Sequence, residues 1–160
     1  MAIEPVPDST GQPDWSDLDL VHAQTLVARM GIKITEASAK RVVGTMPVAG
    51  NTQPYGLMHG GASCVLAETL GSVGAALHAG DDRFTVGIEI SATHHRAVSA
   101  GLVTGIATQA HAGRTLATYE IVINDDRGRR VCTARLSCLV RDAIPGGARP
   151  QRRLTHRTDV

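Results

Sequence analysis

The feature that most constrains the fold is the run of small and aliphatic residues over 59–80, which opens His-Gly-Gly. Its length and composition predict one helix from His59 to Ala79. Because this helix is apolar nearly all round, it should be buried on most sides. Two features are locally unfavourable. Gly60 and Gly61 open the helix, although helical glycine costs ~1 kcal/mol relative to alanine, and Glu68 adds a carboxylate. Local rules tend to fail at functional sites.

Each unfavourable feature has a chemical interpretation. Glycines at a helix start leave backbone N–H groups bare at its positive end, where a developing oxyanion or a thioester oxygen can bind. A carboxylate in apolar surroundings is a stronger base or nucleophile, because water no longer stabilises its charge. Two structural alternatives stay open. The glycines could permit close helix packing, and Glu68 could pair with a core arginine such as Arg135.

The spacing of Gly60 and Glu68 adds a constraint. They are eight residues apart, so their backbones are separated by ~12 Å along a helix. A Glu side chain cannot close that gap to the ~3 Å that joint action on one carbonyl requires. If both act on one substrate, they come from different copies of the chain. This predicts an antiparallel homodimer with two equivalent sites.

The rest of the chain alternates in the manner of β-strands. A short helix is expected over 18–30. The expected strands cover residues 31–36, 41–47, 83–94, 102–111, 115–124 and 130–141. The last four strands should form an antiparallel meander, with Phe84, Val86, Ile88 and Ile90 on one face.

The order ββ-helix-ββββ predicts an α+β fold in which a curved antiparallel sheet wraps around one long central helix. The edge of the sheet at 83–94 would be exposed. Pairing that edge across a two-fold axis would cover it and bring two helices together.

The length of 160 residues suits one domain. We expect a flexible N-terminal arm at 1–17, the folded domain at 18–141 and a flexible basic tail at 142–160. Three cysteines, too few for a disulfide framework, favour a reducing cytoplasm. The net charge is only +1, so the basic tail is interpreted as solvated and nucleic acid is not expected as a partner. No apolar run approaches ~20 residues, so no membrane span is expected.

The remaining motifs narrow the chemistry by elimination. No metal constellation emerges, since His94 and His95 are adjacent on a strand and point to opposite faces. There is no G-x-S-x-G motif, so Ser63 and Ser72 are poor nucleophiles, and there is no phosphate loop. A reaction driven by a carboxylate is the interpretation that remains.

Two segments carry a family resemblance. They are residues 51–63, which read NTQPYGLMHGGAS, and residues 66–72, which read LAETLGS. Together they resemble the signature of the hotdog-fold acyl-CoA thioesterases. The subgroup that these segments resemble contains the PaaI-type phenylacetyl-CoA enzymes, the Arthrobacter-type 4-hydroxybenzoyl-CoA thioesterase and the 1,4-dihydroxy-2-naphthoyl-CoA hydrolases. The similarity runs from about Met30 to Val140 and is most specific over 51–72.

The resemblance implies a role for five residues. Glu68 would be the catalytic carboxylate, as nucleophile or as general base for water. The Gly60 backbone N–H would polarise the thioester carbonyl, and His59 and Gln53 would lie near that carbonyl or the departing sulfur. Ser72 would help to place Glu68 or the water. In the family the glycine and the carboxylate come from opposing subunits, in agreement with the spacing argument.

The resemblance also implies contacts with the rest of the substrate. These would be made by Gly61, Val86, Gly87, Ile88, Arg96, Gly113, Arg114 and Thr115. The strand containing 86–88 would run beside the pantetheine arm, and Arg96 with the turn 113–115 would lie near the nucleotide phosphates. The family pattern is broken at Thr93, where an asparagine is expected. A solvated strand end remains the alternative for Arg96 and Arg114.

The predicted function is therefore hydrolysis of an acyl-CoA thioester with an aromatic or otherwise bulky acyl group. No metal or cofactor is expected, because coenzyme A is part of the substrate. The expected assembly is a homodimer with shared sites, paired into a dimer of dimers. Two alternatives stay open: an acyl-thioester hydratase or dehydratase of the same fold, and a non-catalytic acyl-CoA-binding module.

Overall fold

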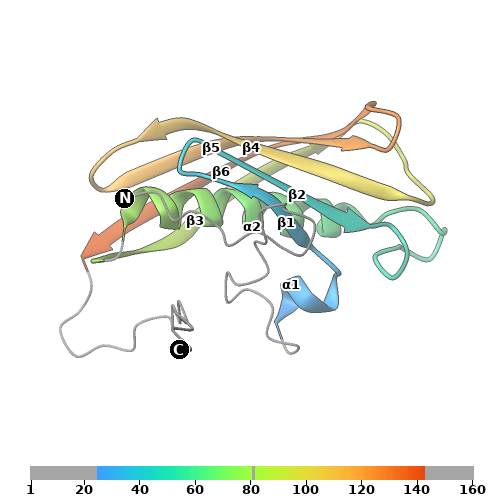
Figure 1. Ribbon diagram of the computed structural model, residues 1–160. Coiled ribbons are helices and arrows are strands. Elements are labelled where there is room, and N and C mark those ends of the chain that lie inside the picture. Colours follow the sequence, from blue (N-terminus) through green and yellow to red (C-terminus); the bar gives the residue numbers. More distant parts are fainter. Residues whose placement is uncertain (1–24, 81, 143–160) are drawn as a thin grey trace, which may run out of the picture.

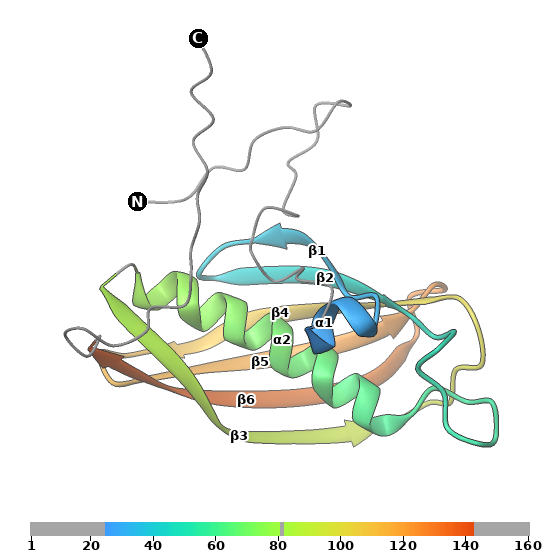
Figure 2. The same ribbon diagram turned by 90° about the horizontal axis from the view of Figure 1, so that it is seen from below.

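The computed structural model describes residues 25–80 and 82–142. Six antiparallel strands form one curved sheet, and the long helix α2 lies across its concave face (Figure 1, Figure 2). The elements in chain order are α1 (Leu26–Arg29), β1 (Lys33–Ala37), β2 (Arg41–Pro47), α2 (Gly60–Ala79), β3 (Arg83–His94), β4 (Leu102–Ala112), β5 (Leu116–Asp125) and β6 (Arg130–Asp142). The predicted α+β order is confirmed.

The predicted boundaries need small changes. Within the helix expected over 18–30, α1 spans only Leu26–Arg29, because Thr25 is its N-cap, and residues 18–24 lie outside the described part of the chain. Strand β6 reaches Asp142, one residue beyond the predicted end of the folded domain at 141. The predicted arm at 1–17 and the rest of the predicted tail also lie outside the described residues.

The sheet order is β1-β2-β4-β5-β6-β3, so the predicted four-strand meander is wrong for β3. Strand β3 pairs with β6 at the edge of the sheet and does not pair with β4 (Figure 2). The physical reason lies in the connection from β3 to β4, which is not a tight turn. It passes the start of α2 and accepts backbone hydrogen bonds there, from Met58 N–H to Val98 O (2.7 Å) and from Val48 N–H to Gly101 O (2.9 Å).

The prediction that Phe84, Val86, Ile88 and Ile90 share one face is also wrong. The register against β6 shifts between Gly87 and Glu89, so Ile88 is an extra residue in a β-bulge. A bulge reverses the alternation of faces along a strand. Phe84 and Val86 consequently face away from α2, whereas Ile90 lies opposite the buried Leu136 and faces it.

Helix α2 packs against the sheet with almost no space between them. A Cβ on Gly74 would lie 2.6 Å from Tyr119 Cε1, and a Cβ on Gly71 would lie 2.6 Å from Leu136 Cδ2. Both distances are too short for real contacts, so the helix can approach this closely only with glycine at these positions. Tyr119 is fully buried, and its hydroxyl donates to Ala39 O at 2.6 Å.

The other side of α2 is not covered by its own chain. Gly61, Cys64, Val65, Glu68 and Ser72 are half-buried or exposed, and their spacing places them along one stripe of the helix. The prediction that the helix is buried on most sides is therefore not met within a single chain. The bare stripe runs beside the edge strand β3, which follows α2 in the sequence.

By length and composition alone, α2 could cross a membrane, contrary to the expectation that no segment is apolar enough. It has 20 residues, and its most apolar 18-residue window has a mean hydropathy of 1.2. Half of that window is buried inside the fold. Its apolar composition is accounted for by its place as the core helix under the sheet.

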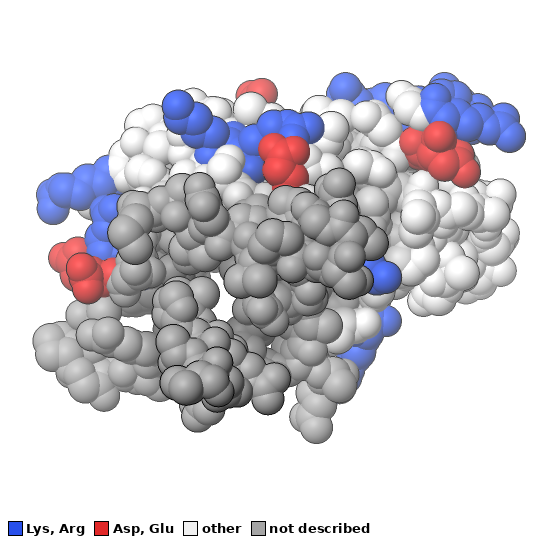
Figure 3. All heavy atoms as spheres, viewed as in Figure 1, with Lys and Arg blue, Asp and Glu red and all other residues white. Residues whose placement is uncertain are grey.

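Charged side chains are dispersed over the face of the molecule that Figure 3 shows. On the face shown in Figure 3, Lys and Arg side chains lie in several separate groups, and acidic side chains lie beside most of them. Cys64, Cys132 and Cys138 are all free thiols. Within residues 25–80 and 82–142 there is no group of three or more His, Cys, Asp or Glu side chains that could hold a metal ion.

Candidate functional site

The segment before α2 is a closed loop that fixes the start of the helix. The His59 N–H donates to Asn51 O (2.9 Å), and Thr52 forms a β-bridge with Met58. The Asn51 side chain anchors the base of the loop by donating from Nδ2 to Met30 O (2.9 Å) and Pro47 O (2.8 Å). Within the loop the Gln53 N–H donates to Leu57 O at 2.8 Å. Gln53 is thus held in a defined place.

The first turn of α2 leaves one backbone donor for a ligand. The Gly61 N–H donates to His59 Nδ1 (2.8 Å), and the Ala62 N–H donates to His59 O (2.9 Å). The Gly60 N–H has no partner among the described residues. It lies at the positive end of a 20-residue helix, where an oxygen that gains negative charge is stabilised. The Gly61 N–H is already used by the side chain of His59, which caps the helix, so this N–H is not free to bind substrate.

The cap also determines which nitrogen of His59 carries a proton. His59 is the N-cap residue, with extended backbone at φ −71° and ψ 133°. Since Nδ1 accepts from the Gly61 N–H, the proton of the neutral ring lies on Nε2. The exposed ring therefore presents an N–H donor, which suits a carbonyl oxygen or a departing sulfur.

A hollow of about 450 Å³ opens at this end of the molecule. Gln53, Gly60 and Arg96 line it together, so three predicted site residues meet there. Its apolar lining includes Leu57, Met58, Ala97 and Val131. The hollow thus combines the free Gly60 N–H with an apolar wall.

His94 also lines this hollow, and sequence reasoning missed it. Its ring lies against Gly60, since a Cβ on Gly60 would be 2.8 Å from His94 Nε2. His94 is paired with the buried Cys132 and therefore faces α2. The bulge in β3 was the missing information, because without it the faces of His94 and His95 cannot be assigned to the core or to solvent.

Glu68 lies about two turns along α2 from the hollow. Its side chain reaches over β3, with Oε1 3.4 Å from the position that a Cβ on Gly87 would occupy. The carboxylate is exposed. The ion pairs found in the described residues are Glu36–Arg41 and Asp125–Arg129, and Glu68 takes part in neither.

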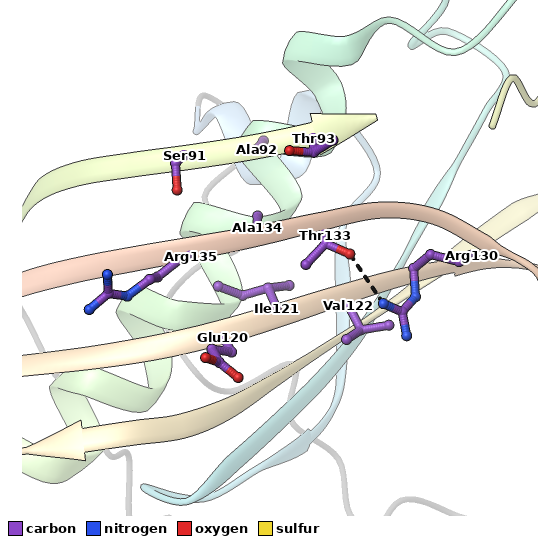
Figure 4. A pocket seen from close by; sticks show the side chains of 10 residues that line it. All are labelled: Ser91, Ala92, Thr93, Glu120, Ile121, Val122, Arg130, Thr133, Ala134 and Arg135. Carbon is purple, nitrogen blue, oxygen red and sulfur yellow. Dashed lines mark hydrogen bonds between the residues drawn. The ribbon is translucent and has the colours of Figure 1, made fainter. Parts of the chain in front are cut away.

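The alternative that Glu68 pairs with Arg135 is wrong. Arg135 is exposed and lies beside Glu120, its direct neighbour across β5 and β6. The next residue, Leu136, packs against Gly71 of α2, so Arg135 points to the other side of the sheet. Figure 4 shows it there with Glu120, Arg130 and Thr133, in a shallow hollow on the outer face.

Ser72 and Cys138 lie close to the carboxylate. Ser72 is one turn beyond Glu68 on the same stripe of α2. Burial raises the pKa of the Cys138 thiol, a hydrogen bond with the Ser72 side chain lowers it, and the Glu68 charge raises it. Glu68, Ser72 and Cys138 therefore form one cluster between α2 and the edge of the sheet.

The predicted substrate-binding residues fall in two further places. Val86, Gly87 and Ile88 are exposed on the edge strand, with Val86 49% and Ile88 53% exposed. The turn 113–115 lies at the far end of α2, where Gly113 O contacts His78 Nε2 at 3.0 Å. The helix is ~30 Å long, so this turn is far from Arg96 in the same chain.

Comparisons with known proteins show the family of the chain. Residues 55–132 match the model of the Thioesterase superfamily. The proofreading thioesterase EntH of Cronobacter turicensis is 50% identical over 124 residues, which cover 77% of this chain and 90% of the relative. The EntH of Klebsiella pneumoniae is 48% identical over 117 residues, which cover 72% of this chain and 85% of the relative.

Solved structures share the architecture. Thioesterase HI1161 from Haemophilus influenzae matches with a TM-score of 0.72 and 35% identity, over 75% of this chain and 85% of that chain. A variant of thioesterase PA1618 from Pseudomonas aeruginosa matches with a TM-score of 0.75 and 35% identity, over 82% and 96%. The chain therefore belongs to the thioesterase superfamily, has the hotdog fold and is a thioester hydrolase.

Proposed function

We propose that the chain hydrolyses acyl-CoA thioesters with an aromatic or otherwise bulky acyl group, at sites shared between two copies. The observation that carries this proposal is the arrangement along α2. An unpartnered Gly60 N–H lies at a hollow that has both polar and apolar lining, while the unpaired Glu68 carboxylate lies ~12 Å away on the same helix. Each is half of a catalytic site, and a second copy supplies the other half.

The edge strand β3 is where the second copy would bind. It is the last strand of the sheet, and its exposed apolar side chains Val86 and Ile88 lie beside the bare stripe of α2. Antiparallel pairing of β3 with the partner's β3 would satisfy the open edge and cover that stripe. The two α2 helices would then run antiparallel, with the partner's Glu68 facing the Gly60 hollow. Two such dimers would form the proposed tetramer.

The proposed reaction needs only groups that these two copies supply. The thioester carbonyl oxygen accepts from the Gly60 N–H, which makes its carbon more electrophilic. The partner's Glu68 attacks that carbon directly, or it removes a proton from a water that attacks. The C–S bond then breaks, the thiolate of coenzyme A leaves and takes up a proton, and the acid is released after hydrolysis. We propose no metal or additional cofactor.

The protein groups around the carbonyl have separate tasks. The His59 Nε2–H is a donor for the carbonyl oxygen or the departing sulfur, and Gln53 lines the hollow together with Gly60. Val86, Gly87 and Ile88 would flank the pantetheine arm along the edge strand. Arg96 and the turn 113–115 lie at opposite ends of α2, so both can approach one nucleotide only if the turn comes from the other copy.

The central test replaces Glu68 with glutamine, which keeps its size and removes its charge. We expect turnover of aromatic acyl-CoAs, followed by release of free thiol, to fall by about 10²–10⁴-fold, as for loss of a general base. The control is Glu120→Gln, which removes a carboxylate on the outer face of the sheet and should leave turnover unchanged. Full activity of Glu68→Gln would refute the role of this carboxylate.

Mixing variants tests whether the site is shared. Glu68→Gln chains and Gly60→Pro chains, each inactive alone, should recover about a quarter of wild-type activity when mixed equally. Half of the dimers are then mixed, and one of their two sites is intact. If each site lay within one chain, no mixed dimer would contain an intact site. Absence of recovery when native mass spectrometry shows mixed dimers would therefore contradict sharing.

A further inference from the structure

The turn that joins β4 to β5 is tied to the C-terminal end of α2 by two side chains. His78, in the last turn of the helix, donates from Nε2 to Gly113 O at 3.0 Å, because a carbonyl oxygen can only accept. Arg83, the first residue of β3, donates from Nη1 to Arg114 O at 3.2 Å. It also donates from Nε to Ala79 O, the last residue of α2, at 3.0 Å. Its guanidinium thus joins the turn to the end of the helix.

The third carbonyl of the turn is occupied as well. Thr115 O accepts from the Val140 N–H of β6 at 2.9 Å. The N–H groups of Arg114 and Thr115 have no partner among the described residues, and both residues are exposed. Free backbone N–H groups beside a guanidinium favour an anionic group, whereas free carbonyl oxygens at the same place would repel it. The hydrogen bonds to the three carbonyls therefore give the turn its preference for an anion.

The spacing along α2 indicates which site this turn would serve. This step rests on the proposed function, in which Gly60 faces the partner's Glu68. An α-helix advances ~1.5 Å per residue, so Gly60 and His78 of one chain are ~27 Å apart along its axis. In the antiparallel pair, the partner's His78 lies only ~15 Å from the level of Gly60, because it is ten residues beyond the partner's Glu68. It lies toward the end of the molecule where Arg96 lines the hollow.

We propose that His78 and Arg83 are positioning residues, which hold the turn 113–115 of one chain against the nucleotide phosphates of an acyl-CoA whose carbonyl is bound at Gly60 of the other chain. The pantetheine arm joins the thioester to the phosphates, so the two chains hold opposite ends of one ligand. Neither side chain touches the reacting atoms. Their effect therefore falls on the binding of the nucleotide, and so on KM and not on kcat.

The first test compares His78→Ala with His78→Gln on an aromatic acyl-CoA. Loss of the hydrogen bond that orders the turn should raise KM about fivefold and leave kcat constant, which corresponds to ~1 kcal/mol at 1.36 kcal/mol per tenfold change. Glutamine keeps an N–H donor and should restore most of the wild-type KM. Arg83→Met removes the second donor and should act as His78→Ala does. The control substrate is the pantetheine thioester of the same acid, which lacks the phosphates and should have the same KM in every variant.

The second test determines which chain of the dimer holds the nucleotide. In mixed dimers of Glu68→Gln and Gly60→Pro chains, the active site combines Gly60 of the first chain with Glu68 of the second. Adding His78→Ala to the Gly60→Pro chain should raise KM for acyl-CoA about fivefold. Adding it to the Glu68→Gln chain should leave KM unchanged. A general effect of the substitution on the fold would raise KM in both mixtures.

Three results would overturn the inference. They are an unchanged KM of His78→Ala for acyl-CoA, an equal increase with the pantetheine thioester, and an increase that is the same for both placements in mixed dimers. The comparison of the two substrates is made with Glu68 intact. Its failure while Glu68→Gln is inactive would therefore remove the role of His78 and Arg83 alone, whereas full activity of Glu68→Gln would remove the proposed function.

Discussion

Replacement of Gly60 by proline removes the backbone N–H donor at the start of α2 and still allows the helix to form. Gly60 is the first residue of α2, a position where proline is tolerated because no intrahelical bond uses its N–H. The preceding residue, His59, already has the extended backbone that proline requires before it, with φ −71° and ψ 133°. The helix should therefore form in Gly60→Pro with its cap intact.

Gly60→Ala is the matched control. Both substitutions add a Cβ, which would lie 2.8 Å from His94 Nε2, so both displace the exposed His94 ring. Only proline removes the N–H. The difference between the two variants thus isolates the donor, whose loss from an oxyanion site costs about 10²–10³ in kcat, or ~2.7–4 kcal/mol.

The assay is release of free thiol from an aromatic acyl-CoA, with kcat and KM determined for both variants. Circular dichroism and thermal unfolding check that the two folds are equivalent. We expect Gly60→Pro to be at least about 10²-fold slower than Gly60→Ala. Equal rates in two folded variants would refute the argument that the end of α2 polarises the carbonyl.

Three other predictions concern stability and assembly. Gly74→Ala should lower the free energy of unfolding by about 1–3 kcal/mol in urea titrations, because its Cβ would overlap the Tyr119 ring, and an unchanged midpoint would contradict this packing. Burial, and then the Cys64 charge, raise the pKa of Cys132 from 9.0 to about 11. The buried, protonated thiol should therefore contribute its full share to the free energy of unfolding below pH 9, and this share should be lost as pH rises through about 11. Unfolding titrations over this pH range should show a smaller decline for Cys132→Ala. Ile88→Lys should place a charge on the edge of β3 and yield monomers in analytical ultracentrifugation. Intact dimers would show that the interface does not lie at β3.

The sequence was most informative where one physical rule dominates. The small and aliphatic residues from Gly60 to Ala79 correctly predicted one long helix across the sheet. The free N–H at Gly60 was also predictable, because glycines at a helix start leave the backbone bare. The use of the Gly61 N–H by the His59 ring was not, since it depends on a side-chain rotamer.

Sequence reasoning failed where a single inserted residue determines which face a side chain occupies, or where a distant contact determines what covers it. Ile88 is the bulge of β3, and no rule of composition marks it as the extra residue. It reversed the faces of Val86 and Ile90 and hid the position of His94 beside Gly60. The expected shielding of Glu68 from water is not met within one chain, because the proposed cover belongs to a second copy.

The uninterrupted α-helical geometry of α2 limits which insertions and deletions its sequence can accept. Each residue advances an α-helix by about 100°, so the angle between the polarising end and the carboxylate is set by the number of residues between them. One residue inserted between Gly60 and Glu68 would swing the acid away from Gly87 and out of phase with its counterpart. The number of residues between Gly60 and Glu68 therefore cannot change without breaking this alignment.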